Sequence, residues 1–192
     1  MMNKMKPIAA AGALLAAACA ARHRAGRRRS GLERLQKDLR LIRYYGEDIL
    51  ASPGMRRSRR FLQHGRTSVY RHSLSVALLC LRLSRVLHLK VDRRAMVRGA
   101  LLHDYFLYDW HDSDPDHRWH GFTHPKRALK NARADFPLGG VEADMIVSHM
   151  FPLTPKPPFH REGWILCGAD KICSLRETLK RTNRKATGGR SE

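Results

Sequence analysis

The stretch that decides the fold spans residues 69–89 and reads VYRHSLSVALLCLRLSRVLHL. Its apolar residues recur at helical spacing and cover more than one face, so we expect a helix that lies centrally among others. Thr67 or Ser68, directly before it, is a typical N-cap residue. His72 departs from the apolar pattern one turn into the helix. Taken alone, it is more typical of a hydrogen-bonded core histidine than of a ligand.

Helical patterns continue on both sides of this stretch. Upstream, apolar residues recur at three- and four-residue steps from Leu32 to Leu50, and we expect that helix to end at Ser52-Pro53-Gly54. Downstream, the pattern predicts helices over residues 93–107 with Asp92 as N-cap, from Thr123 with Pro125 in the first turn, over 141–150 and over 161–182. No Val/Ile/Tyr alternation indicates a sheet. The sequence therefore predicts an all-α fold.

The length and charge of the chain suggest one domain between two tails. A chain of 192 residues allows one domain with a real core and little more. We expect a basic, flexible N-terminal tail (1–31), a single helical domain (32–180) and a basic C-terminal tail (181–192). The net charge of +20 favours anionic partners such as nucleotides, nucleic acid or acidic lipid. It is equally compatible with solubility alone.

The N-terminal tail imitates a secretory signal, because Lys4 and Lys6 precede the apolar run Ile8–Ala21. That run is Ala-rich and shorter than the roughly 20 apolar residues needed to cross a bilayer. The arginines at 22–29 oppose translocation. The four cysteines form no C-x-x-C pair, which suggests free thiols in a reducing compartment. We expect a cytoplasmic protein without stable membrane insertion, and a membrane or export role stays open as the alternative.

Polar residues at apolar helix positions carry the chemistry, because a buried imidazole or carboxylate is costly unless a partner satisfies it. His103 and Asp104 follow an apolar helical run in the sequence GALLHD. Such a pair can bind one cation, or the carboxylate can reach a second cation beside it. Alternatively, the pair caps the helix end. Three further residues repeat the pattern of a polar side chain in an apolar helix or at its end: His124, His149 and Asp170.

The order of these residues is more specific than any one of them. A histidine, a His-Asp pair, two more histidines and a final aspartate fall on five different predicted helices. Helices packed in one bundle can direct such side chains to a common centre. The candidate metal ligands are therefore His72, His103, Asp104, His124, His149 and Asp170.

This order resembles the HD superfamily of metal-dependent phosphohydrolases, whose signature His…His-Asp…Asp matches His72, His103-Asp104 and Asp170. The resemblance covers roughly residues 60–180 and is strongest to compact bacterial HD-domain proteins, in the runs HDYFLYDWH, GFTHPKRAL and SHMFPLT. It implies an HD-type helical bundle with one ion held by His72, His103 and Asp170. It also implies a second ion held by His124 and His149, with Asp104 as the bridging, catalytic carboxylate. The Gly-Tyr-Pro motif of cyclic-dinucleotide phosphodiesterases is absent, so their substrate is not carried over.

The resemblance implies a hydrolase that acts on a phosphoester or phosphoanhydride, in a nucleotide or similar small anion. Two divalent cations (Mn, Mg, Co, Zn or Fe) supply hydroxide from water near neutral pH. Lys126, Lys171 and Arg66 are the cations nearest in sequence to the ligands and are candidates for binding substrate phosphates. Each is at least as compatible with a solvated surface charge. Three loop histidines fit an ordinary loop better than a site entrance: His111, His117 and His120.

Two other functions stay open. Some HD-type proteins with these six ligands hold two irons and oxidise their substrates with dioxygen. The other alternative is a non-catalytic module that binds nucleic acid through its basic surface. Against this module, no aromatic residues interleave with the Arg run 56–60, as they usually do in single-strand binders.

Overall fold

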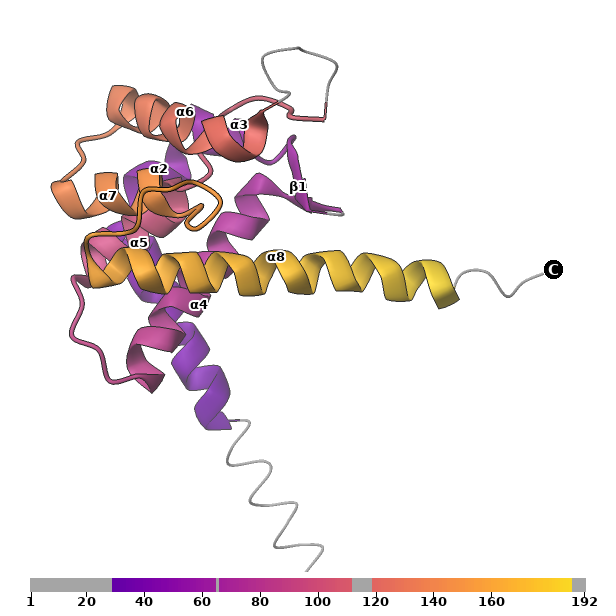
Figure 1. The fold of residues 1–192 in the computed structure, drawn as a ribbon. Coiled ribbons are helices and arrows are strands. Elements are labelled where there is room, and N and C mark those ends of the chain that lie inside the picture. Colours follow the sequence, from indigo (N-terminus) through magenta and orange to yellow (C-terminus); the bar gives the residue numbers. More distant parts are fainter. Residues whose placement is uncertain (1–28, 65, 112–118, 188–192) are drawn as a thin grey trace, which may run out of the picture. The chain divides into compact units, whose positions relative to one another are not determined.

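The computed structural model describes residues 29–64, 66–111 and 119–187 (Figure 1). The chain divides after Arg40 into two compact units. In the first unit, the described residues 29–40 are helical. The second unit begins at Leu41 and contains all six candidate ligands. The predictions for residues 1–28, for His117 and for residues 188–192 lie outside the described residues.

The second unit is almost entirely helical, which confirms the predicted all-α class. Residues 41–45 are helical. The next elements are α2 (Glu47–Ala51), α3 (Pro53–Arg57), β1 (Leu62–His64), β2 (Thr67–Ser68), α4 (Val69–Val86), α5 (Arg93–Leu102), α6 (His120–Asp135), α7 (Gly140–Ser148) and α8 (Arg161–Thr187). Strands β1 and β2 form a small antiparallel hairpin that pairs Leu62 with Ser68. The sequence pattern did not predict this hairpin.

Side-chain caps fix the starts of α4 and α5. The Ser68 hydroxyl accepts a hydrogen bond from the Arg71 amide (3.4 Å), and the Asp92 carboxylate accepts one from the Ala95 amide (2.9 Å). Both residues were predicted caps, and each satisfies an amide that has no partner within the helix. The two helices that carry the first three ligands therefore begin where the sequence places them.

Helix α4 ends at a residue with a left-handed backbone conformation. His88 has φ 52°, which residues other than glycine rarely adopt. It allows the amides of Leu89 and His88 to donate to the carbonyls of Ser84 (2.9 Å) and Arg85 (3.3 Å). This pair of bonds is a Schellman motif, which satisfies carbonyls that the helix end leaves without partners.

Several predicted helix ends were wrong. Helix α5 ends at Leu102 and not near residue 107. Helix α6 begins at His120, one turn before the predicted cap Thr123, whose hydroxyl donates to the Trp119 carbonyl (3.1 Å). Pro125 therefore lies inside α6, although still near its start. The error arose because Thr and Pro are typical of helix starts, and the earlier residues look like a polar loop.

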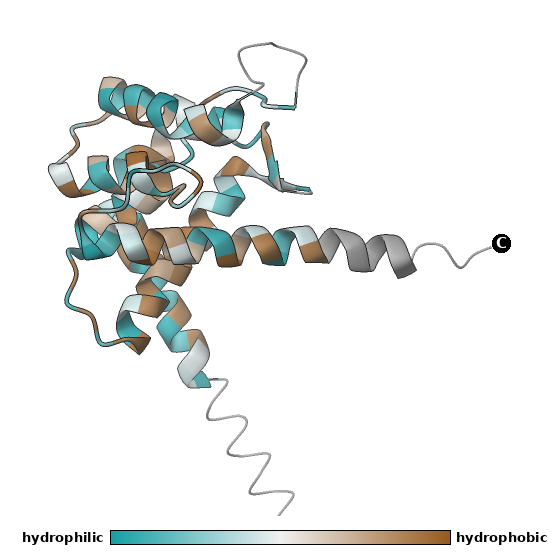
Figure 2. Ribbon diagram, in the orientation of Figure 1, coloured by the Kyte–Doolittle hydropathy of each residue, from teal (hydrophilic) through white to brown (hydrophobic). Residues whose placement is uncertain are grey.

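Helices α4, α5, α7 and α8 pack on one another around the core, and Figure 2 shows hydrophobic residues along α4 and α8. As predicted, α4 is central and packs on α5 and α8. Helices α5 and α7 approach closely at Gly99, where an added Cβ would lie 2.7 Å from Sδ of Met145. This close packing brings the C-terminal ends of α5 and α7 together. None of the described helices combines the length and apolar character needed to cross a bilayer.

Candidate metal centre

The structure brings all six predicted ligand residues into one buried cluster. His72 lies in the first turns of α4, and Asp170 lies on α8. His103 and His149 are the C-cap residues of α5 and α7, and Asp104 follows His103. His124 belongs to α6. The most exposed of the six is Asp170, at 7%.

The two oxygens of the Asp104 carboxylate face two groups of histidines. Oδ2 lies 3.2 Å from Nε2 of His103 and 3.7 Å from Nε2 of His72. Oδ1 lies 3.3 Å from Nε2 of His124 and 3.6 Å from Nε2 of His149. Each group, together with Asp104, has the mutual spacing of a metal site. We call them the His72 group and the His124 group.

Asp170 completes the His72 group. Its Oδ1 lies 3.0 Å from Nε2 of His72 and 3.8 Å from Nε2 of His103. The hydroxyl of Ser174, one turn further along α8, donates to the same oxygen (3.2 Å). The group therefore offers two imidazole nitrogens and two carboxylates.

All four histidines present Nε2 to the centre, because Nδ1 of each donates a hydrogen bond outward. The acceptors are carbonyl or carboxylate oxygens, so Nδ1 of each ring carries a proton, and Nε2 is the nitrogen whose lone pair can bind a cation. The four bonds are His72 to Glu177 Oε2 (3.1 Å), His103 to the Ala100 carbonyl (2.9 Å), His124 to the His120 carbonyl (2.8 Å) and His149 to the Ile146 carbonyl (2.8 Å).

This arrangement fits divalent cations. Nε2 of His124 and Nε2 of His149 are only 2.9 Å apart, so two lone pairs face each other unless a cation or a proton lies with them. Nε2 of His103 and Oδ1 of Asp104 are buried without a hydrogen-bond partner. Imidazole and carboxylate donors together suit Mn, Fe, Co or Zn. A cation in each group would satisfy all of these atoms.

The pKa shifts within the cluster also show that the site favours positive charge. Burial alone would raise the pKa of Asp104, but the positive charge of His103 holds it well below its usual value of 3.8. Burial alone would lower the pKa of His72, but hydrogen bonds to Asp170 and Glu177 raise it to about 9. Burial and the positive charge of His124 lower the pKa of His149 to about 3. The carboxylates are thus ionised and attract cations of any kind.

Two supporting residues were missed in the sequence. Glu177 holds His72, and it lies seven residues after Asp170 on the same face of α8. That spacing was a usable signal. Gln63 on β1 donates from Nε2 to Oδ2 of Asp104 (2.6 Å). No local pattern marks Gln63, because the hairpin that carries it was not predicted.

The loop histidines have different outcomes. The prediction that His120 is an ordinary loop residue was wrong, because it begins α6 and its ring stacks on His124 (4.5 Å between centroids, 16°). The other face of His120 stacks on Trp110 (4.9 Å, 10°). His111 is exposed and lies against Trp110. The candidate ligand His124 therefore belongs to a stack of three rings with His120 and Trp110.

The three candidate phosphate-binding cations differ in position. Nζ of Lys171 donates to the carbonyls of His149 (3.3 Å) and Cys167 (3.5 Å), which places its charge beside the His124 group. Lys126 and Arg66 are exposed. Their role in substrate binding stays a prediction.

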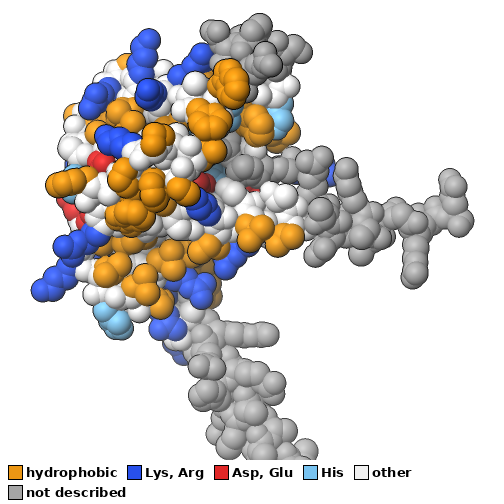
Figure 3. Space-filling view, in the orientation of Figure 1, with side chains coloured by type: hydrophobic (Ala, Val, Ile, Leu, Met, Phe, Trp, Pro, Cys, Tyr) orange, Lys and Arg blue, Asp and Glu red, His pale blue; other side chains and the backbone are white. Residues whose placement is uncertain are grey.

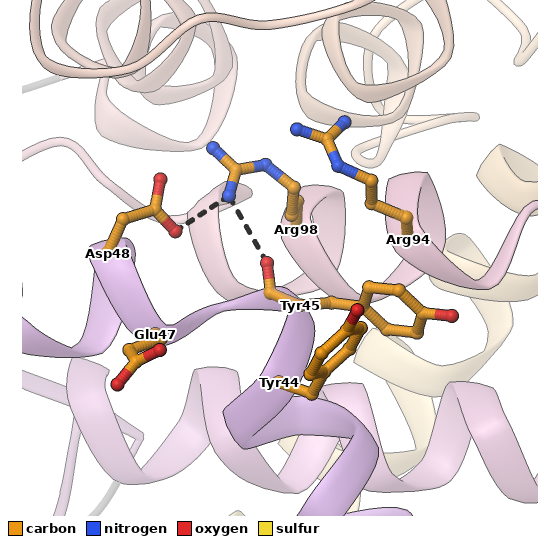
Figure 4. Close-up of a pocket in the computed structure, with 6 residues that line it drawn as sticks. All are labelled: Tyr44, Tyr45, Glu47, Asp48, Arg94 and Arg98. Carbon is orange, nitrogen blue, oxygen red and sulfur yellow. Dashed lines mark hydrogen bonds and ion pairs between the residues drawn. The ribbon is translucent and has the colours of Figure 1, made fainter.

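A separate pocket of about 590 Å³ contains none of the six candidate ligands (Figure 4). It is lined by Tyr44, Tyr45, Glu47, Asp48, Arg94 and Arg98. Arg98 donates from Nη1 to Oδ1 of Asp48 (2.7 Å) and to the Tyr45 carbonyl (3.2 Å). Arg94 pairs with Glu142 (3.3 Å). Since these charges largely cancel, we interpret the residues as an ion-pair network that ties α2 and α7 to α5.

One comparison with known proteins gave a match. A family model described as "HD domain" matches residues 69–175, which is more than half of the chain. The matched range contains all six residues of the cluster. No curated protein and no solved structure matches the chain.

Proposed function

The chain belongs to the HD-domain family, and on that premise we propose that it is a metal-dependent phosphohydrolase with a two-metal centre. The observation that carries the proposal is the division of one carboxylate between two groups of ligands. Oδ2 of Asp104 faces His72 and His103, and Oδ1 faces His124 and His149. The proposed substrate is a phosphoester or phosphoanhydride in a nucleotide or similar small anion.

In this proposal the His72 group, with Asp170, holds one ion and the His124 group holds the other. When bound, the two cations supply hydroxide near neutral pH and stabilise negative charge on a phosphoryl group. Asp104 would serve both ions, because its two oxygens face the two groups, and it stays ionised because its pKa lies well below the usual range. The outward hydrogen bonds of the four rings keep every Nε2 directed inward. Buried, preorganised ligands of this kind need little rearrangement during turnover.

The cations of the chain orient the substrate in this proposal. Lys171 is held beside the His124 group by two carbonyl oxygens, which leaves its charge available to a phosphate oxygen. Arg66 follows strand β1, whose Gln63 contacts Asp104. Lys126 lies two residues after His124 and is exposed. Each is proposed to bind a substrate phosphate.

The test is metal analysis and a substrate screen on purified protein. The protein is stripped with a chelator, reloaded with Mn²⁺, Co²⁺ or Mg²⁺, and tested for phosphate release from a panel of phosphorylated metabolites. We expect two metal equivalents in the native chain, and hydrolysis that Asp104→Asn abolishes. Asp109→Asn, the same change at an exposed aspartate, serves as the control and should retain activity.

Two results would contradict the proposal. Full hydrolysis by Asp104→Asn would show that the shared carboxylate is not required. Alternatively, aerobically purified protein could contain iron, absorb visible light and consume dioxygen without releasing phosphate. That result would assign the same ligands to di-iron oxidation chemistry.

A further inference from the structure

A surface rich in arginine borders the metal centre. Between Asp48 and Asp92 the chain contains nine Lys and Arg residues and no acidic residue. Five exposed arginines lie between the end of α3 and the first turn of α4, and we call them the arginine hairpin: Arg57, Arg59, Arg60, Arg66 and Arg71. The arginines of the ion-pair network described above, Arg94 and Arg98, lie outside this hairpin.

The chain folds back here, so that two of the arginines lie over aromatic rings. The amides of Tyr70 and Val69 donate to the carbonyls of Ser58 (3.3 Å) and Phe61 (2.9 Å), which joins the two arms of the segment. The guanidinium of Arg59 then lies 4.3 Å over the Tyr70 ring. The guanidinium of Arg57 lies 5.6 Å from the Phe61 ring. The aromatic partners that the linear sequence lacks around residues 56–60 are therefore supplied partly by the other arm.

A second exposed surface lies on α6, the helix that carries His124. Trp119 and Phe122, at the start of α6, are 62% and 48% exposed, and their ring centroids are 6.1 Å apart. Lys126 follows Phe122 by one turn on this helix. Figure 3 shows Lys and Arg side chains beside hydrophobic ones over α6, and Figure 1 shows β1 and α6 at the same end of the fold.

Asp104 connects the two surfaces. Its Oδ2 accepts the hydrogen bond of Gln63 from the hairpin (2.6 Å), and its Oδ1 faces His124 of α6 (3.3 Å). The elements that carry the two surfaces therefore meet at the proposed metal centre.

We propose that this composite surface binds single-stranded nucleic acid. The guanidinium groups pair with successive backbone phosphates, and the exposed rings of Trp119 and Phe122 stack on unpaired bases. A strand carries a phosphate at every residue, so successive phosphates can pair with arginines that are spread along the hairpin. If the end of a bound strand reaches the proposed ions, that step rests on the proposed function. The binding of the strand itself does not depend on the ions or on hydrolysis.

Binding is measured with the full chain, stripped of metal, and a fluorescently labelled single-stranded oligonucleotide of mixed sequence. The double variant Arg60→Glu/Arg66→Glu should bind at least about tenfold more weakly, because phosphate contacts supply most of such affinity. The matched control is Arg82→Glu/Arg93→Glu, two exposed arginines that lie ten residues from His72 and His103 along α4 and α5. That distance is about 15 Å along each helix, so the control should lose much less affinity.

A second variant tests the stacking residues without changing charge. Trp119→Ala should weaken single-strand binding about 5- to 100-fold, the usual range for one stacked base. Trp164→Ala removes an equally large, half-exposed ring from α8 and should leave binding unchanged. Equal losses in hairpin and control variants would overturn the proposal. Duplex bound as tightly as single strand, or no binding by the native chain, would also overturn it.

The failure of this proposal is distinguishable from failure of the proposed hydrolysis. Native, metal-loaded protein is also tested on a chromogenic aryl phosphate and on its diester, which are too small to span the hairpin and the aromatic pair. Strand binding without hydrolysis of any substrate removes only the proposed function. Hydrolysis of small phosphoesters without strand binding removes only the present inference.

Discussion

Replacing Glu177 by alanine is expected to weaken one of the two proposed metal sites and leave the other intact. Oε2 of Glu177 accepts the hydrogen bond from Nδ1 of His72 at 3.1 Å, and its side chain is 10% exposed. A hydrogen bond to a charged group contributes about 1.5–3 kcal/mol. Since tenfold in affinity corresponds to about 1.4 kcal/mol, the loss should be about 10- to 100-fold. Similar losses are typical when the outer partner of a ligating histidine is removed.

The assay is calorimetric titration of Mn²⁺ or Co²⁺ into chelator-treated protein, with two classes of site resolved. We expect Glu177→Ala to weaken the site of the His72 group alone, because His124 and His149 donate outward to backbone carbonyls that the change leaves in place. Glu177→Gln retains an acceptor but loses the charge, so its effect should be intermediate. Thr178→Ala, at the exposed neighbouring position, is the control. Unchanged affinity in Glu177→Ala, or equal weakening of both sites, would refute the reasoning.

Three further predictions concern stability. Gly99→Ala should lower the free energy of unfolding by about 1–3 kcal/mol in urea titrations, because the new Cβ would press on Met145; full stability would mean that α5 and α7 separate easily. His88→Gly should raise the free energy of unfolding by about 0.5–1 kcal/mol, because glycine adopts φ 52° without strain. A decrease in this free energy would show that the histidine side chain itself stabilises the turn. Burial raises the pKa of Cys167 and Cys173 from 9.0 to about 11. The contribution of the two buried thiols to stability is therefore complete below pH 9. It decreases between pH 9 and 11, because the thiols of the unfolded chain ionise first. Cys167→Ser/Cys173→Ser should flatten this decline when melting temperature is measured against pH.

The six cluster residues could be predicted because each is polar where its surroundings are apolar. A buried imidazole such as that of His103 needs a partner, and the spacing of the polar residues along separate helices indicated a shared one. Their partners outside the helical pattern could not be predicted in the same way. Gln63 reaches Asp104 through a hairpin whose register depends on contacts with Ser58, Phe61 and the start of α4. Local propensity contains no information about such contacts.

Helix boundaries failed where local signals compete. Thr123 and Pro125 are typical of a helix start, yet α6 begins at His120, where stacking on Trp110 and His124 holds an additional turn. Ser52 and Pro53 indicate a break, and the chain does leave α2 there. The same two residues also begin α3, because the Ser52 hydroxyl accepts the Met55 amide (3.1 Å) and Pro53 occupies the first turn. The sequence signal was correct for the break and incomplete for the short helix after it.

The placement of His103 and His149 as C-caps has a thermodynamic consequence. The C-terminal end of a helix has a partial negative charge, and α5 and α7 both direct this end toward ionised carboxylates. The negative ends of α5 and α7 and the carboxylates thus repel one another, and a bound cation would relieve this repulsion. An ion that binds only the native chain stabilises it in proportion to the logarithm of its concentration. The supply of ions would then set the thermal stability of the protein.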